Sequence, residues 1–116
     1  MGAFESLLPD AVKQISHLSG TEWAIPFPAI LDVIDVASAH SIAILGVEEF
    51  LLVASGLQCA GLSGYEFYVD GPWEEFVKKN NQAASDYFHG RAFTAETRFI
   101  LSTTSLDEFR ELVKED

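Results

Sequence analysis

The chain has 116 residues, of which 48% are apolar, and this content suffices for the core of one domain. Its 7 Lys and Arg residues stand against 18 Asp and Glu residues, and the resulting net charge of −11 argues against nucleic acid as a partner. No segment has the roughly 18 consecutive apolar residues of a membrane span, and the lone Cys59 forms neither a disulfide within the chain nor a thiolate metal cluster.

The sequence predicts one domain over residues 1–116, because it contains no internal repeat, low-complexity segment or linker rich in proline and glycine. The N-terminal segment carries Glu5, Pro9 and Asp10, where a signal peptide needs a basic start followed by an apolar run. We therefore expect a cytoplasmic protein without a membrane partner.

Two helices are predicted in the N-terminal third of the chain. The first covers about residues 6–18, where apolar side chains recur at helical spacing, at Leu8, Val12, Ile15 and Leu18. A connector that contains Trp23 and Ile25 follows. The second helix begins at Pro28 and ends near Ala39, and its exposed stripe carries Asp32 and Asp35.

The middle of the chain is typical of strands. Residues 42–45 form a short apolar run that predicts a buried strand, broken or bulged at Gly46. Residues 50–53 either continue this strand or form a short helix, and we favour the strand. Three glycines, Gly56, Gly61 and Gly64, then indicate a loop. Residues 65–70 alternate between an apolar and a polar face, as expected for a half-buried strand.

The strongest local prediction is a helix from Pro72 to Phe88, which ends at Gly90. One stripe of this helix is apolar, comprising Trp73, Phe76, Val77, Ala84, Tyr87 and Phe88. A last strand covers residues 97–103, and Ser105 with Glu108 forms a capping box before a terminal helix. The predicted class is α+β, with a small mixed or antiparallel sheet of about three to four strands packed with about four helices in a single domain.

Catalytic residues are not indicated. His17, His40 and His89 each lie near a predicted helix end, where an imidazole interacts favourably with the last carbonyl groups. The sequence has no phosphate-binding glycine loop, no nucleophile elbow and no metal signature, so we expect neither a metal nor a cofactor. Glu48 and Glu49 do not form a carboxylate pair in a regular strand, because neighbouring side chains point to opposite faces.

A partner-binding surface is indicated by charge and by aromatic residues. No Lys or Arg occurs between Lys13 and Lys78, so this stretch carries a field of one sign that steers a basic protein. Tyr and Trp supply contact area in protein interfaces. The candidate residues are Glu48, Glu49, Glu66, Tyr68, Asp70, Trp73 and Glu74. The alternative, that Trp73 and Tyr68 belong to the core, stays open.

Three features occur together over residues 25–90: a helix followed by IAILGVEEF at residues 42–50, a glycine-containing loop with an aromatic strand, and a helix with WEEFV at residues 73–77 and Ala83 to Tyr87. This pattern resembles the small immunity proteins of bacterial polymorphic-toxin and contact-dependent growth inhibition systems, and most closely immunity protein family forty. The resemblance implies a cytosolic protein that blocks a cognate toxin C-terminal domain, and many such toxins resemble nucleases with basic substrate channels.

The leading hypothesis is therefore an immunity protein, not an enzyme, that neutralises a basic toxin domain by protein contact, as a monomer or weak homodimer. One alternative is a regulatory adaptor or chaperone for another basic protein. The other is a small hydrolase that uses His40 or His89 with a carboxylate, which requires a pocket holding both groups.

Overall fold

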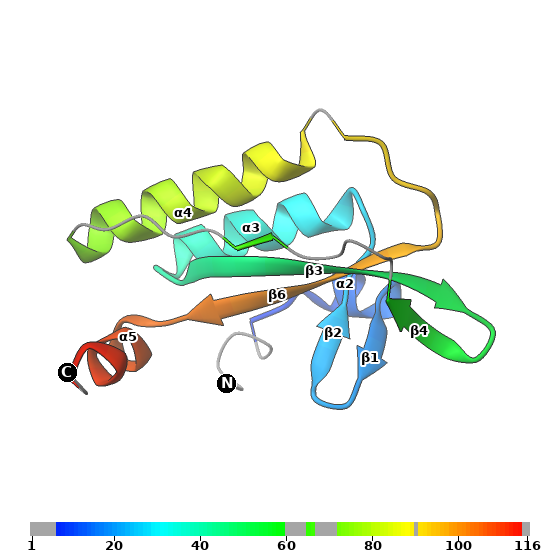
Figure 1. The fold of residues 1–116 in the computed structure, drawn as a ribbon, viewed down its shortest axis with the longest axis horizontal. Coiled ribbons are helices and arrows are strands. Elements are labelled where there is room, and N and C mark those ends of the chain that lie inside the picture. The colour runs from blue at the N-terminus through cyan, green and yellow to red at the C-terminus, as the bar shows by residue number, and fades with distance from the viewer. Residues whose placement is uncertain (1–6, 60–64, 67–71, 90, 115–116) are drawn as a thin grey trace.

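The computed structural model describes residues 7–59, 65–66, 72–89 and 91–114, and Figure 1 shows how their elements are arranged. In this part of the chain the helices are α2 (Asp10–Gln14), α3 (Ala29–Ala39), α4 (Trp73–Phe88) and α5 (Leu106–Lys114). The strands are β1 (His17–Ser19), β2 (Glu22–Ala24), β3 (Ala43–Val53), β4 (Gly56–Cys59), β5 (Tyr65–Glu66) and β6 (Thr97–Thr104). The fold class is α+β, as predicted.

Strand β3 organises the main sheet. It pairs antiparallel with β6 along one edge and with β4 and β5 along the other, which makes a sheet of four strands. The register against β6 shifts between Ile44 and Gly46, so Leu45 is an extra residue in β3. The predicted irregularity at Gly46 is thus confirmed. The strand interpretation of residues 50–53 is also confirmed, since they pair with β4.

The loop predicted to begin at Gly56 is wrong. Strands β3 and β4 form a tight hairpin in which Val53 pairs with Gly56 across Ala54 and Ser55. Gly56 has a φ of +126°, which a residue with a Cβ rarely adopts, so the glycine closes the turn and begins β4. The glycines at positions 61 and 64 lie outside the described residues.

The predicted helix over residues 6–18 is also wrong, because α2 covers only Asp10–Gln14. The hydroxyl of Ser16 donates a hydrogen bond to the carbonyl of Val12 at 2.6 Å, and the chain then turns into β1. The helical spacing of apolar residues does not define a buried face, since Ile15 and Leu18 are 54% and 51% exposed whereas Val12 is buried.

The predicted connector after the first helix is instead the second arm of a hairpin. Strands β1 and β2 pair antiparallel, with Leu18 opposite Trp23. Just after β2, Ile25 and Phe99 exchange two backbone hydrogen bonds of 2.7 and 2.9 Å. This bridge fixes the hairpin to the outer edge of β6.

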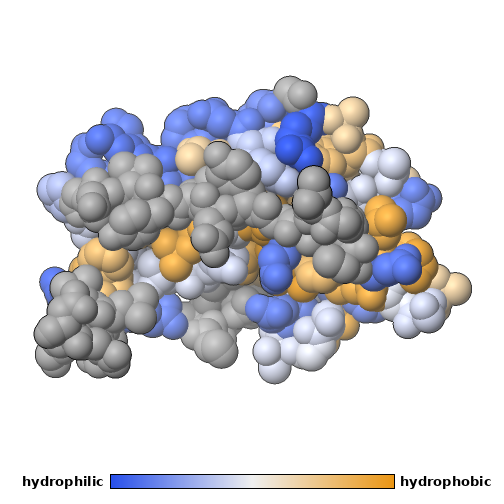
Figure 2. All heavy atoms as spheres, viewed as in Figure 1, coloured by the Kyte–Doolittle hydropathy of each residue, from blue (hydrophilic) through white to orange (hydrophobic). Residues whose placement is uncertain are grey.

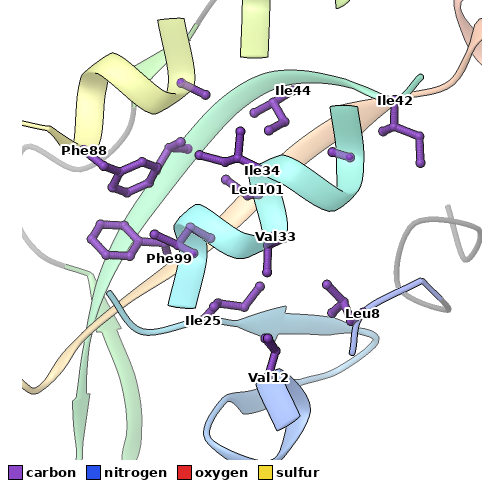
Figure 3. Close-up of a cluster of buried hydrophobic side chains, with 14 residues drawn as sticks. Leu8, Val12, Ile25, Val33, Ile34, Ile42, Ile44, Phe88, Phe99 and Leu101 are labelled. Atoms are coloured by element: carbon purple, nitrogen blue, oxygen red, sulfur yellow. The ribbon is translucent and has the colours of Figure 1, made fainter. Parts of the chain in front are cut away.

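Helices α3 and α4 run in opposite directions and cover one face of the sheet (Figure 1). A cluster of apolar side chains lies beneath them (Figure 3). Its residues come from α3, β3, α4 and β6, and from positions in or next to α2 and β2. The core cluster comprises Leu8, Val12, Ile25, Ile30, Val33, Ile34, Ala37, Ile42, Ile44, Val47, Ala84, Phe88, Phe99 and Leu101. The apolar stripe predicted for α4 is therefore largely the face that the sheet buries, and Asp32 and Asp35 of α3 are exposed, as predicted.

The first half of α4 holds a second apolar cluster. Phe76 and Val77 are buried there against Ala43. The ring of Phe109, from α5, lies 4.8 Å from the ring of Phe76 and 5.3 Å from that of Trp73. Helix α5 thereby packs on the start of α4 through an aromatic contact.

The predicted capping box at the start of α5 is confirmed. The backbone N–H of Ser105 donates to Glu108 Oε1 at 2.9 Å, and the N–H of Glu108 donates to Ser105 Oγ at 3.3 Å. The first of these bonds lowers the pKa of the Glu108 carboxyl, because it stabilises the ionised form.

Two adjacent asparagines of α4 are buried, and they differ in their hydrogen bonding. Asn81 bridges the free edge of β3: its Oδ1 accepts from the N–H of Ile44 at 2.8 Å, and its Nδ2 donates to the carbonyl of Ile42 at 2.9 Å. The same Nδ2 donates to Ser38 Oγ on α3 at 2.9 Å. Asn80 donates only to the carbonyl of Phe76, and its Oδ1 has no partner among the described residues.

Candidate binding groove between helices α3 and α4

The two adjacent glutamates of β3 point to opposite faces of the sheet, as predicted. Glu49 faces α4, because its carboxylate accepts a hydrogen bond from the hydroxyl of Tyr87 at 3.1 Å. Glu48 is exposed on the other face. The pair therefore contributes one carboxylate to each side of the sheet and no joint acidic site.

The remaining predicted surface residues lie at β5 and at the start of α4. Glu66 belongs to β5, but its side chain lies outside the described residues, as do Tyr68 and Asp70. Trp73 is half-buried, and its ring stacks on Phe76 with centroids 5.7 Å apart. Glu74 follows it in the exposed first turn of α4. Trp73 and Glu74 are thus the predicted residues that the structure places together.

These two residues line a groove of about 390 Å³ between α3 and α4. The apolar part of the lining consists of Ile34 and Val77, which are both buried. The rest of the lining is largely polar and comprises Asp35, Ser38, Ser41, Trp73, Glu74, Lys78, Asn81, Gln82 and Ser85. Hydrophilic residues also gather over α4 along the upper edge of Figure 2. The groove therefore joins an apolar contact surface to hydrogen-bonding groups.

The charges beside the groove are not neutralised by described neighbours. Lys79 pairs with Glu75 at 3.5 Å, whereas Glu74 and Lys78, at the same four-residue spacing, form no ion pair with each other. Asp35, Glu74 and Lys78 make no ion pair with any residue that the structure describes. The last turn of α3 has no basic residue to balance its negative end. Within the described ranges, two carboxylates and one ammonium group beside the groove thus have no partner of opposite charge.

Sequence reasoning identified the exposed carboxylate of Asp35 but missed the groove beside it. The missed polar residues are Ser38, Ser41, Asn81, Gln82 and Ser85. Their types carry no motif, and their positions on two helices meet only after the helices have packed. Asn81 alone had a usable signal, because it lies four residues from the buried Val77 on the same helical face.

A second polar cluster lies at the other end of α4. The guanidinium of Arg91 lies 3.7 Å from Glu49 Oε1, and its central carbon lies 4.5 Å from the centre of the Tyr87 ring. Burial, together with the charge of Glu49 and the hydrogen bond to it, raises the pKa of Tyr87, while the charge of Arg91 acts in the opposite direction. Glu49 is thus engaged within the chain.

This cluster gives a titration prediction. Replacing Glu49 by glutamine should lower the pKa of Tyr87 toward its ordinary value without reaching it, because burial still opposes ionisation. The native state retains the phenolic proton longer than the unfolded state, so stability should fall as the pH rises above about 10. Difference absorbance titration against Tyr87→Phe isolates this tyrosine from the other two. An unchanged pKa in Glu49→Gln would contradict the contribution assigned to Glu49.

None of the three histidines lines the groove, although His89 Nδ1 lies 2.8 Å from the carbonyl oxygen of Ser85, which does. His40 and His89 follow the ends of α3 and α4 as predicted, whereas His17 begins β1 rather than ending a helix. Among the described residues, no cluster of three His, Cys, Asp or Glu side chains is arranged to hold a metal ion. No described helix has the length and apolar content needed to cross a membrane.

No protein-family model, curated protein or solved structure matches the chain.

Proposed function

We propose that this chain is an immunity protein that binds a basic bacterial toxin domain and neutralises it by direct contact. The observation that carries the proposal is the groove between α3 and α4, where the carboxylates of Asp35 and Glu74, which form no ion pair with a described residue, line the same groove as the half-buried indole of Trp73. The net charge of −11 and the absence of basic residues between Lys13 and Lys78 support a basic partner. The resemblance of residues 25–90 to immunity proteins supports a toxin as that partner.

The proposed mechanism has two stages. The acidic surface first accelerates encounter with the basic partner, and this effect weakens as salt screens the charges. The partner then buries Trp73 and the apolar floor of the groove. This burial slows dissociation, because a few desolvated anchor residues carry most of the binding energy. The protein acts in the cytoplasm as a monomer or weak homodimer, and the bound toxin domain loses access to its substrate, most simply a nucleic acid.

The function is tested by co-expression with the C-terminal toxin domain encoded by the gene immediately upstream. We expect that domain to stop bacterial growth alone, the present chain to restore growth, and the purified pair to form a stable complex. Association should slow as the salt concentration rises. Absence of rescue by a folded, co-expressed chain would overturn toxin neutralisation. Complex formation without rescue would instead favour the adaptor or chaperone alternative.

The face that steers association can be located with two charge-reversed double variants. Glu66→Lys with Asp70→Lys alters the surface predicted from sequence, and Asp32→Lys with Asp35→Lys alters the exposed side of α3 by the same total charge. We expect the α3 variant to slow association more at low salt, because Asp35 lines the groove. A larger effect from the first variant would place the docking surface at residues 66–70 instead.

A further inference from the structure

We infer that the groove between α3 and α4 holds an arginine side chain of the protein partner. This inference deepens the proposed function and rests on it, because it takes the partner to be a basic protein. The groove has the size of a small ligand pocket. Its volume of about 390 Å³ is near the lower end of the roughly 300–1,000 Å³ typical of ligand pockets. A space of this size accommodates one extended side chain with its flanking backbone, and not a packed helix.

The lining matches the two parts of an arginine. Ile34 and Val77 provide an apolar floor, on which the methylene stem of a long basic side chain packs favourably. The carboxylates of Asp35 and Glu74 complement a cation, and the half-buried indole of Trp73, which stacks on Phe76, borders the groove as an aromatic neighbour for that cation. The groove thus combines apolar contact with acceptors for a positively charged head group.

Arginine suits this lining better than lysine does. A guanidinium presents five N–H donors in one plane, stacks on aromatic rings and is less strongly hydrated than an ammonium group. The lining offers neutral acceptors besides the carboxylates, namely the hydroxyl of Ser41, the amide oxygen of Gln82, and Ser38 Oγ, which accepts one hydrogen bond from Asn81 and has room for a second. A planar donor with several N–H groups uses such a dispersed set, whereas the compact ammonium group of lysine reaches fewer of them.

The occupant is a basic protein and not a second copy of this chain. A second copy also carries a net charge of −11, so two copies repel each other. Of the three arginines of a second copy, Arg91 is paired with Glu49 and Arg98 donates to the carbonyl of Ala95 at 2.7 Å, while Arg110 is exposed on α5, so the repulsion between like charges carries this step. Lys78 stands beside the groove without an ion pair to a described residue, and it opposes a bound cation. Neutralising Lys78 should therefore strengthen the binding of a cation, whereas neutralising Asp35 or Glu74 should weaken it.

The experiment uses the full chain and a capped Gly-Arg-Gly peptide as the probe, followed by nuclear magnetic resonance. We expect the peptide to shift the side-chain amide signals of Asn81 and Gln82 and the indole N–H signal of Trp73. A peptide with uncharged citrulline in place of arginine has nearly the same shape, and its affinity should be lower by at least about tenfold. A lysine peptide should bind more weakly than the arginine peptide.

Matched variants assign the effect to the groove. Asp35→Asn and Glu74→Gln should each weaken the arginine peptide by about threefold to fivefold, and Lys78→Gln should strengthen it. Asp32→Asn is the control, because Asp32 is exposed on the same helix but does not line the groove. Its affinity should stay at the wild-type value. If Asp32→Asn weakened binding as much as Asp35→Asn, the attraction would come from general charge and the inference would fail.

The remaining outcomes separate this inference from the proposed function. Two results with the wild-type protein alone would overturn the arginine site. One is equal affinity for the citrulline and arginine peptides, and the other is a set of chemical-shift changes confined to β3 and β6. Tighter binding of free arginine than of the capped peptide would make the groove a small-molecule site and overturn a protein occupant. Growth rescue by wild type together with absent peptide binding would remove the arginine site but leave toxin neutralisation standing. Selective peptide binding without rescue would support the arginine site and remove the toxin.

Discussion

Replacing Phe76 by alanine should lower the free energy of unfolding by about 3–5 kcal/mol, the usual cost of truncating a buried phenylalanine. Phe76 is only 1% exposed, and it packs against Val77, Ala43 and the ring of Phe109. Removal of the ring loses apolar burial and leaves a cavity beneath the contact between α4 and α5. Denaturant unfolding followed by circular dichroism measures the change, which is large compared with the stability of an ordinary domain.

Phe27→Ala is the matched control for this prediction. Phe27 is 37% exposed, although its ring lies near those of Phe88 and Phe93. The same chemical truncation should therefore cost clearly less than at Phe76, about 1–2 kcal/mol. Equal losses at the two positions would contradict the central place of Phe76 in the packing of α4.

Replacing Asn81 by leucine should cost about 2–4 kcal/mol, because it removes the partner of one backbone group in β3 and of one just before it. The side chain of Asn81 is 3% exposed and serves both the N–H of Ile44 and the carbonyl of Ile42, as a neighbouring strand would. Leucine has the same branched shape but a larger volume, so overpacking adds to the loss of the hydrogen bonds. The Asn80→Leu control makes the same change in volume. Amide hydrogen exchange at Ile44 should accelerate in the variant, in parallel with the fall in stability.

Asn80→Leu is the control, and it should behave in the opposite way. Asn80 is fully buried, and its Oδ1 has no hydrogen-bond partner among the described residues. Its Nδ2 donates to a carbonyl of its own helix, Phe76 O. Leucine at this position removes an unsatisfied acceptor, so stability should change by less than about 1 kcal/mol or increase. If both variants lost the same free energy of unfolding, burial alone would account for the two losses, and the hydrogen bonds from Asn81 to the start of β3 would add no measurable stability.

The sequence predicted the elements whose local signals agree with their packing. Pro72 sets the start of α4, and Ser105 with Glu108 sets the start of α5. In both cases the signal is local: a proline that fits the beginning of a helix, and side chains that reach the first free N–H groups. Tertiary packing agrees with these local signals and does not change where the helices begin.

The N-terminal prediction failed where tertiary contacts decide the structure. Spacing alone treats Val12, Ile15 and Leu18 as one helical face, but only Val12 reaches the core. The bridge between Ile25 and Phe99 holds the following residues as a strand beside β6. A pairing partner more than 70 residues away leaves no trace in local periodicity.

The candidate site was predictable only in part, for a related reason. Trp73 and Glu74 stood out because of their residue types and because they begin a helix. Asn81 and Ser38 are ordinary polar residues until α3 and α4 pack side by side and bring them within 2.9 Å. A groove between two helices is a property of their packing, and no single segment encodes it.

The extra residue in β3 has a consequence for how this chain tolerates insertions and deletions. Because Leu45 is unpaired against β6, Ile44 and Val47 both face the helices although they are three positions apart. Deleting Leu45 would restore a regular strand and force one side of it to turn over, which would exchange the environments of Glu48 and Glu49. Descendants of this chain should therefore retain the residue count of β3, and they should keep an apolar side chain at position 45, because Leu45 packs on the cluster of Ala43, Phe76 and Val77.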